Sequence, residues 1–248
     1  MSKYKYAILI GLICIIFSFA VSGVNAKETT SIKVAEDAAV FEGRPDLNRG
    51  GADYLYVGVG CYKDGYASRT WLKFDLSTLP DGIVITKAEL RIYFESIVSW
   101  GDGAPGGISL YFSSDDTWSE TMITWNNQPS LSFTGGLVTT IPQNLYDGWV
   151  SFDVTSYVAG QYSEDKVTSW CLCAANEEGE GRNFNTADSK ERSSTHAPYL
   201  YVEYETGPQF VIPITPYGTA AIIATAVTAF SAVVLLSKRK TSRYSAPH

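Results

Sequence analysis

The sequence predicts an all-β domain, an antiparallel β-sandwich of the jelly-roll type, followed by a single C-terminal transmembrane helix. Three observations lead to this prediction. Short segments alternate apolar and polar residues with a period of two, turn residues separate these segments, and one long uncharged apolar run lies near the C-terminus. About ten such segments in one domain are typical of two packed β-layers.

The N-terminus has the features of a secretory signal peptide, which we place at residues 1–26. Lys3 and Lys5 precede an apolar run from Ala7 to Ala20, and Val24-Asn25-Ala26 offers small residues for cleavage. The run is short for a helix that spans a membrane, so we expect it to be removed.

The β-sandwich is expected over residues 27–206. In one segment Ala88, Leu90, Ile92 and Phe94 alternate with polar neighbours, which marks a strand with one buried face. The expected strands are Ser31–Ala35, Tyr54–Val59, Arg69–Asp75, Ala88–Phe94, Ile108–Phe112, Leu137–Ile141, Trp149–Val154, Ser169–Ala175 and Tyr199–Tyr204.

One helical turn is expected over Ser156–Gly160. Asp153 and Thr155 offer capping side chains at its start, and Gly160 offers an end. Asp153 is therefore expected to cap a helix rather than to act as a catalytic acid.

The C-terminal segment predicts a membrane anchor. Prolines within residues 207–218 predict a short stiff stalk. The 18 residues from Thr219 to Leu236 carry no charge, enough for a helix across a hydrocarbon core of about 30 Å. Lys238-Arg239-Lys240 follows at once and favours the cytoplasmic side. We expect a transmembrane helix at 219–237, a cytoplasmic tail at 238–248, and a cell-surface, single-pass protein with its domain outside.

The charge of the outer domain is strongly negative. The segment from Lys27 to Phe210 holds all 26 acidic residues but only 13 of the 19 basic ones, a formal charge of −13. Such a field repels phosphates and attracts divalent cations, so nucleic-acid binding is disfavoured.

Three cysteines follow the signal peptide, at positions 61, 171 and 173. Outside the cell a disulfide is permitted, and Cys61 could pair with either of the other two, so the pairing stays open. Cys171 and Cys173 would share one face of a strand and cannot readily pair with each other. His196 is the only histidine in the domain, so a zinc site is not expected.

Trp118 and Trp125 lie seven residues apart around a short Met122-Ile123-Thr124 strand. Because seven is an odd offset, the two rings would point to opposite faces of one continuous strand. We therefore expect this segment to bend.

Six segments, in order, resemble one family. They are Asn48–Gly51 with Tyr54–Gly58, Arg69–Pro80, Ala88–Phe94, Trp118–Pro129, Asp153–Thr155 and Ala197–Tyr204. With these segments the chain is similar, from about Ile32 to Tyr204, to a DNRLRE domain, the disaggregatase-related repeat, a type of carbohydrate-binding module known in alginate-binding forms. The resemblance implies a β-sandwich that binds polysaccharide without cutting it, with Trp118 and Trp125 in its framework. The C-terminal anchor also resembles those of archaeal surface proteins.

Sugar binding requires flat aromatic rings and planar polar groups. Trp71 and Lys73 share one face of a predicted strand, and Arg91 and Tyr93 share the corresponding face of another. If the two strands are neighbours, these four residues form a basic and aromatic platform. Trp100, in a glycine-rich loop, is a further ligand-binding candidate.

No cofactor is expected, although a structural calcium ion has two candidate sites. The acidic segments Glu177–Gly181 and Asp115-Asp116 offer oxygen ligands of the kind that calcium prefers.

The sequence therefore favours a membrane-tethered, non-catalytic module that holds a polysaccharide. The negative charge argues for a neutral glycan, or for calcium-bridged contact with an acidic one. The alternative is a structural or adhesive protein that binds other cell-envelope proteins. An enzyme acting on polysaccharide is less favoured, because no spacing singles out a carboxylate pair and His196 has no evident partner in the sequence.

Overall fold

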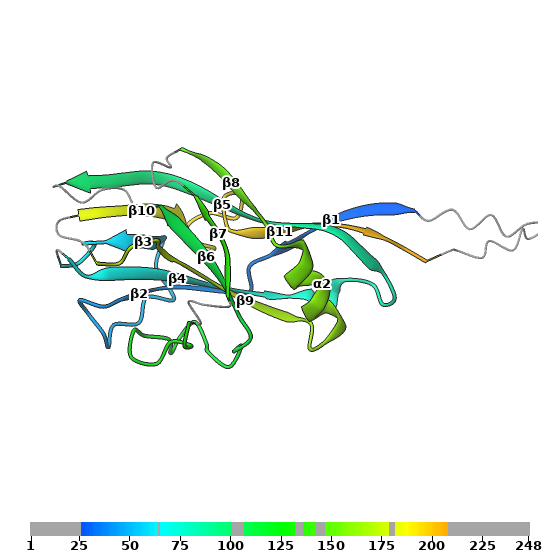
Figure 1. Cartoon of the computed structure of the whole chain (residues 1–248), viewed down its shortest axis with the longest axis horizontal. Helices are drawn as coiled ribbons and strands as arrows, with labels where there is room; N and C mark the ends of the chain where they lie inside the picture. The colour runs from blue at the N-terminus through cyan, green and yellow to red at the C-terminus, as the bar shows by residue number, and fades with distance from the viewer. Residues whose placement is uncertain are drawn as a thin grey trace, which may run out of the picture. The chain divides into compact units, whose positions relative to one another are not determined.

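The computed structural model of the chain describes residues 26–63, 65–100, 107–131, 136–141, 147–178 and 182–207, without the side chains of Ser99 and Trp100 (Figure 1). Residues 24–208 form one compact unit. Almost all of the expected signal peptide, and the stalk, transmembrane helix and tail apart from Gly207, lie outside the described residues. Within the described ranges, no helix is both long enough and apolar enough to cross a membrane.

The domain is all-β and antiparallel, as predicted. Its described residues form an 11-stranded sheet that curls into two layers. The layers are joined where Gly58 and Val59 pair with Ser68 and Ala67. The first layer contains β1 (Lys27–Lys33), β11 (Tyr199–Glu205), β5 (Val84–Trp100), β8 (Gly148–Asp153), β10 (Arg182–Asp188) and β3 (Tyr54–Val59). The second contains β2 (Glu36–Phe41), β4 (Ala67–Asp75), β9 (Val167–Ala174), β6 (Ile108–Ser113) and β7 (Leu137–Ile141).

The main hydrophobic core lies between the inner faces of the two layers. Leu90 and Leu200 of the first layer belong to the same buried cluster as Leu72, Phe74 and Trp170 of the second. The alternating burial along β11 follows directly from the alternation of its sequence. Each large apolar side chain in this core contributes roughly 1.5–3 kcal/mol. The apolar residues whose alternation predicts the sandwich are therefore the residues that stabilise it.

The helix α2 (Thr155–Ser163) packs Val158 into this core. Asp153 Oδ1 accepts hydrogen bonds from the Thr155 amide, at 3.0 Å, and from the Thr155 hydroxyl, at 2.6 Å. Asp153 thus has a structural role at the start of the helix, although the N-cap residue itself is Val154, which makes no side-chain capping bond. The expected end at Gly160 is wrong, because the helix continues through it; a glycine inside a helix costs only about 1 kcal/mol.

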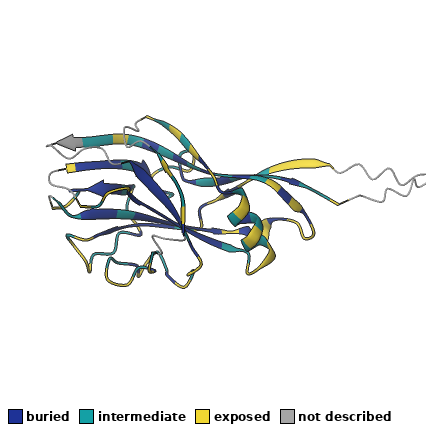
Figure 2. Cartoon of the chain, in the orientation of Figure 1, coloured by how far each residue is buried: buried dark blue, intermediate teal, exposed yellow. Residues whose placement is uncertain are grey.

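Two strands were not predicted, β2 and β10. All but one residue of β2 is buried, so its sequence does not alternate. β10 is rich in polar residues but lies between β3 and β5, and Figure 2 shows most of it dark blue. β5 is also longer than expected and ends at Trp100, so the backbone of this residue belongs to a strand rather than to the predicted loop.

Residues 114–131, which we name the covering loop, lie over the outer face of the second layer. Trp118 and Ile123 from this loop join Trp71, Cys171 and Cys173 in a second buried cluster. The loop bends, as predicted.

The expected Met122–Thr124 strand does not form. Asn127 supplies these residues with hydrogen bonds that a sheet would otherwise make: its Oδ1 accepts from the Thr124 amide at 2.6 Å, and its Nδ2 donates to the Met122 carbonyl at 3.0 Å.

The cysteines at 61, 171 and 173 are all free, so none of the disulfides considered from the sequence is present. Cys171 and Cys173 lie on the same face of β9, beneath the covering loop, as the two-residue spacing predicts. Burial raises the pKa of the Cys61 thiol to about 12 and that of Cys173 to about 12 as well.

Candidate functional site

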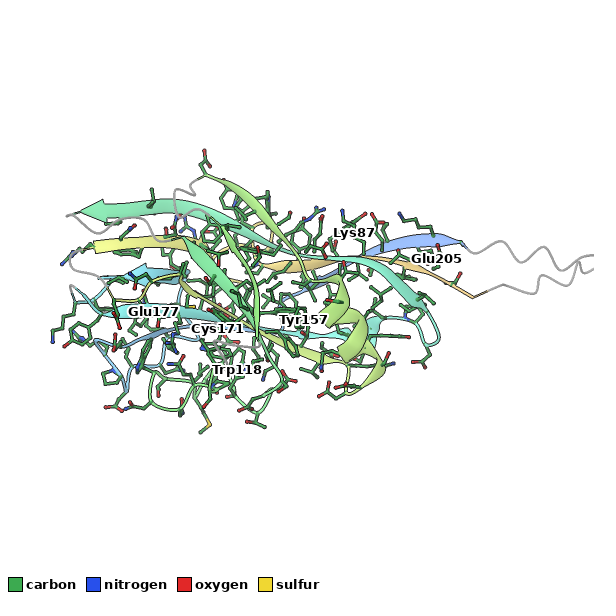
Figure 3. All side chains as sticks on the ribbon, in the orientation of Figure 1. Lys87, Trp118, Tyr157, Cys171, Glu177 and Glu205 are labelled. Carbon is green, nitrogen blue, oxygen red and sulfur yellow. The ribbon has the colours of Figure 1, made fainter. Side chains whose placement is uncertain are left out.

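The predicted platform of Trp71, Lys73, Arg91 and Tyr93 is not formed. Trp71 and Lys73 lie on β4 in the second layer, whereas Arg91 and Tyr93 lie on β5 in the first, and these two strands do not pair. Figure 3 shows Lys87, which shares the outer face of β5, and Trp118 on opposite sides of the domain.

Trp71 and Lys73 support the covering loop instead. Trp71 is 0% exposed, its ring centroid lies 6.0 Å from that of Trp118, and its Nε1 donates to Gln128 Oε1 at 3.0 Å. The Lys73 ammonium donates to Glu36 Oε1 at 3.0 Å and to the Trp118 carbonyl. In this structure neither side chain presents a surface to a ligand. The side chain of Trp100 lies outside the described residues.

The two tryptophans of the covering loop occupy framework positions. Trp118 is buried and its Nε1 donates to Ser169 Oγ at 3.1 Å. The Arg69 guanidinium lies over the ring of Trp125, 4.5 Å from the ring centroid. These contacts agree with the framework role that the resemblance implies.

Arg91 and Tyr93 lie on the outer face of the first layer, within a group of mainly aromatic side chains. The strand register explains the group, because directly paired residues of antiparallel strands point to the same side. Tyr93 pairs with Trp149 of β8, and Arg91 pairs with Tyr199 of β11. We name this surface the aromatic face; it consists of Arg91, Tyr93, Trp149, His196, Tyr199 and Tyr201.

The rings of the aromatic face contact one another closely. The Trp149 centroid lies 5.5 Å from that of Tyr93 and 5.1 Å from that of Tyr199, with the planes at 74° and 73°. His196 stacks on Tyr93 at 4.0 Å with an angle of 12°. Trp149 is 40% exposed, which is high for a ring of this size. The group therefore offers the half-exposed ring of Trp149 to solvent, held edge-to-face between Tyr93 and Tyr199.

Polar groups lie at defined positions beside these rings. Arg91 donates to Glu89 Oε2 at 2.7 Å and to the Tyr199 hydroxyl at 3.1 Å, and its guanidinium lies 4.5 Å from the Tyr201 ring centroid. Hydrogen bonds from Lys87 and Arg91 hold the pKa of Glu89 below its usual range. Arg91 and Glu89 are therefore both charged at neutral pH, and the arginine is held in one orientation.

Asp147 extends the polar edge of this surface. Its Oδ1 accepts from the Tyr93 hydroxyl at 2.6 Å, and this bond raises the pKa of the Tyr93 phenol. Tyr93 is thus neutral at any physiological pH, and its hydrogen bond to Asp147 helps to fix the orientation of its side chain.

His196 has a partner that the sequence did not reveal. The buried carboxylate of Asp188 lies 3.2 Å from His196 Nδ1, and its other oxygen accepts from Arg192 Nε at 2.8 Å. Asp188 therefore holds the loop after β10 against the aromatic face and sets the orientation of the imidazole.

Of the calcium candidates from the sequence, Glu177 and Asp115 already have other partners. Both carboxylate oxygens of Glu177 accept from Arg69, at 2.7 and 2.6 Å, and residues 179–181 lie outside the described ranges. Asp115 Oδ1 accepts from the Thr117 amide and hydroxyl. A different group, Asp37, Glu120 and Glu191, brings three carboxylates together.

A hollow of about 420 Å³ lies elsewhere, lined by Asn48, Arg49, Gly51, Ala52 and Asp53. Its lining contains no aromatic ring and so lacks the stacking surface that sugar rings require. The aromatic face is the better candidate.

Trp149, Tyr199, Tyr201 and His196 are the residues of this face that the sequence reasoning missed, and for the first three a signal was available. The signal was present, because both segments alternate and place their aromatic residues on the polar side of the pattern. An aromatic ring in such a position is exposed on an outer face unless a loop covers it.

Comparison with known proteins places the chain in a family. No curated protein matches the chain. The model of carbohydrate-binding module family 96 matches residues 28–204, well over half of the 248 residues, and this match covers nearly the whole described domain. The chain therefore belongs to carbohydrate-binding module family 96.

Proposed function

We propose that this chain is a non-catalytic module that holds an extracellular polysaccharide on its aromatic face. The exposed Trp149 ring is the observation that carries the proposal, since it stands against Tyr93 and Tyr199 beside a fixed arginine. Aromatic rings bind the apolar faces of sugars, and planar polar groups bind pairs of sugar hydroxyls. Membership in a family of carbohydrate-binding modules supports the same function.

The charges around the aromatic face favour a neutral glycan. Lys27 pairs with Glu203 at 2.5 Å, and Lys87 and Arg91 both pair with Glu89 at 2.7 Å. Each of these cations is thus already paired with a carboxylate of the protein, with Glu89 shared by two of them. The domain as a whole is acidic, which disfavours an anionic polymer at long range.

The carboxylates near the aromatic face support binding rather than hydrolysis. Glu89 is bound by Lys87 and Arg91, and Asp188 by Arg192 and His196. Asp147 accepts from the Tyr93 hydroxyl. A glycosidase needs one carboxyl group that is protonated and another that is free to attack or to activate water. All three carboxylates are engaged in contacts within the protein instead.

We further propose that the module is a DNRLRE-type domain tethered to the cell surface. The support is in the sequence: an N-terminal signal peptide, a proline-containing stalk, and the uncharged run from Thr219 to Leu236 followed by three basic residues. The tether is tested by alkaline extraction of membranes. The full chain should stay in the membrane pellet, and a chain ending at Thr206 should not.

The binding function is tested on a glycan array with the fragment Lys27–Thr206. We expect binding to a neutral polysaccharide and no release of reducing sugar. Binding to no glycan, together with capture of cell-envelope proteins, would support the adhesive alternative instead. Release of reducing sugar from any glycan would show that the module is an enzyme.

A further inference from the structure

Three carboxylates from distant parts of the chain meet beside the edge strand β2. Asp37 lies on β2, Glu120 in the covering loop, and Glu191 in the loop after β10. One oxygen from each side chain lies within 4.8 Å of the other two. The fold thus gathers three negative charges at one point where three segments join.

Asp37 is the most constrained of the three. The residue is 1% exposed, and its Oδ2 accepts from the Lys190 backbone amide at 2.9 Å. Its Oδ1 is buried without a hydrogen-bond partner. A buried carboxylate oxygen is unfavourable unless a proton, a hydrogen-bond donor or a cation satisfies it.

The charges around Asp37 do not balance. The Lys190 ammonium contacts Glu120 and lies 3.3 Å from Glu191, so three carboxylates face one cation and leave a net charge of −2. The neighbouring pair of Lys73 and Glu36 is neutral in itself.

We propose that Asp37, Glu120 and Glu191 bind a divalent cation of the calcium type. The donor set consists of carboxylate oxygens alone, as hard cations prefer, without a histidine or cysteine that would favour zinc. Oxygens bound at 2.3–2.6 Å to one calcium ion can lie at most about 5 Å apart, and the three oxygens meet that limit. The charge of the ion would also balance the −2 of the cluster.

The bound ion has a structural task that is separate from sugar binding. It joins β2 to the covering loop and to the loop after β10, whose His196 stacks on Tyr93 of the aromatic face. It therefore stabilises the domain whether or not a glycan is present.

The test is calcium-dependent stability of the full-length protein. The chain is first treated with a chelator, and Tm is then measured over a range of CaCl2 concentrations, with binding heats from calorimetry. At a concentration 100 times Kd, Tm should rise by roughly 5–10 °C. The shift should be largely lost in Asp37→Asn and Glu191→Gln, and should persist in the control Glu178→Gln, an exposed residue outside this cluster.

Two further measurements separate ion binding from general damage. Asn at position 37 keeps an oxygen for the Lys190 amide, so the metal-free Asp37→Asn protein should be at least as stable as the metal-free original. Lys190→Met removes the competing ammonium and should tighten calcium binding. The proposal is overturned if about 10 mM calcium, roughly ten times the weakest Kd of extracellular calcium modules, leaves the Tm of the original protein unchanged. It is also overturned if the Tm of Asp37→Asn and Glu191→Gln rises with calcium as much as that of the control.

Discussion

The side-chain amide of Asn48 donates a 2.7 Å hydrogen bond to the backbone carbonyl of Glu120, 72 residues further along the chain. The same amide donates to the Ile123 carbonyl at 2.8 Å. Asn48 thus binds two carbonyls of the covering loop that have no sheet partner. This pair of bonds holds the loop in the place where it buries Trp71.

Replacing Asn48 by alanine should loosen the covering loop. The two carbonyls would lose their donor, and we expect a loss of about 1–3 kcal/mol in the free energy of unfolding. Urea unfolding measures this loss, and hydrogen exchange should increase within residues 114–131. Unchanged exchange in the loop would show that Asn48 does not hold it.

The neighbouring glycines provide a matched pair of variants. A Cβ on Gly50 would lie 2.1 Å from the Glu120 carbonyl oxygen, whereas a Cβ on Gly51 would have nothing within 4 Å. Gly50→Ala should therefore destabilise the domain by about 1–3 kcal/mol or more, because the backbone of the covering loop must move. Gly51→Ala should be nearly neutral, and equal effects of the two substitutions would contradict the close contact.

Trp71→Ala should unfold more readily rather than lose a ligand contact. The ring is fully buried in the cluster under the covering loop, and its removal should lower the free energy of unfolding by about 3–5 kcal/mol. Met122→Ala is the control, since this side chain is 70% exposed on the same loop. A stable Trp71→Ala protein that has lost glycan binding would restore Trp71 as a ligand contact.

The cysteines should resist thiol reagents in the folded protein. At pH 8 a thiol with a pKa of about 12 is ionised in roughly one molecule in 10⁴, about 10³-fold less often than an unfolded cysteine. Labelling resolved by mass spectrometry should be slow at Cys61 and Cys173 until urea is added.

The same thiols affect stability at high pH. A pKa that is raised in the folded state means that the folded protein holds the proton more tightly than the unfolded chain does. Their contribution to stability is therefore present below the unfolded thiol pKa of about 8.5 and is lost as pH rises above it.

For the labelling experiment, rapid modification of the folded protein at pH 8 would show that these thiols are not buried.

The sequence predicts alternating strands such as β11 and also the largely buried strands β4 and β9, but it misses β2 and β10. β11 and the first part of β5 alternate because the core covers one side of them. In β2 almost every position is buried, so its composition carries no period of two. The limit is physical, since alternation records a difference between two environments.

The same limit explains the mixed outcome for the candidate site. Alternation states which residues share a face of one strand, but it does not state which strands are neighbours or which outer face a loop will cover. Trp71 and Tyr93 therefore have the same sequence signal, although the covering loop buries the first while the second stays only partly buried on the other layer. Only the long-range contacts of residues such as Asn48 distinguish them.

The central claim, that polysaccharide binds to the aromatic face, is tested most directly by Trp149→Ala. Calorimetric titration with the glycan identified on the array compares this variant with the original protein and with Met122→Ala, whose exposed side chain belongs to the covering loop. We expect Trp149→Ala to weaken binding at least about tenfold, or roughly 1.4 kcal/mol, with little change in Tm. Equal affinity of Trp149→Ala and the original protein would contradict the account.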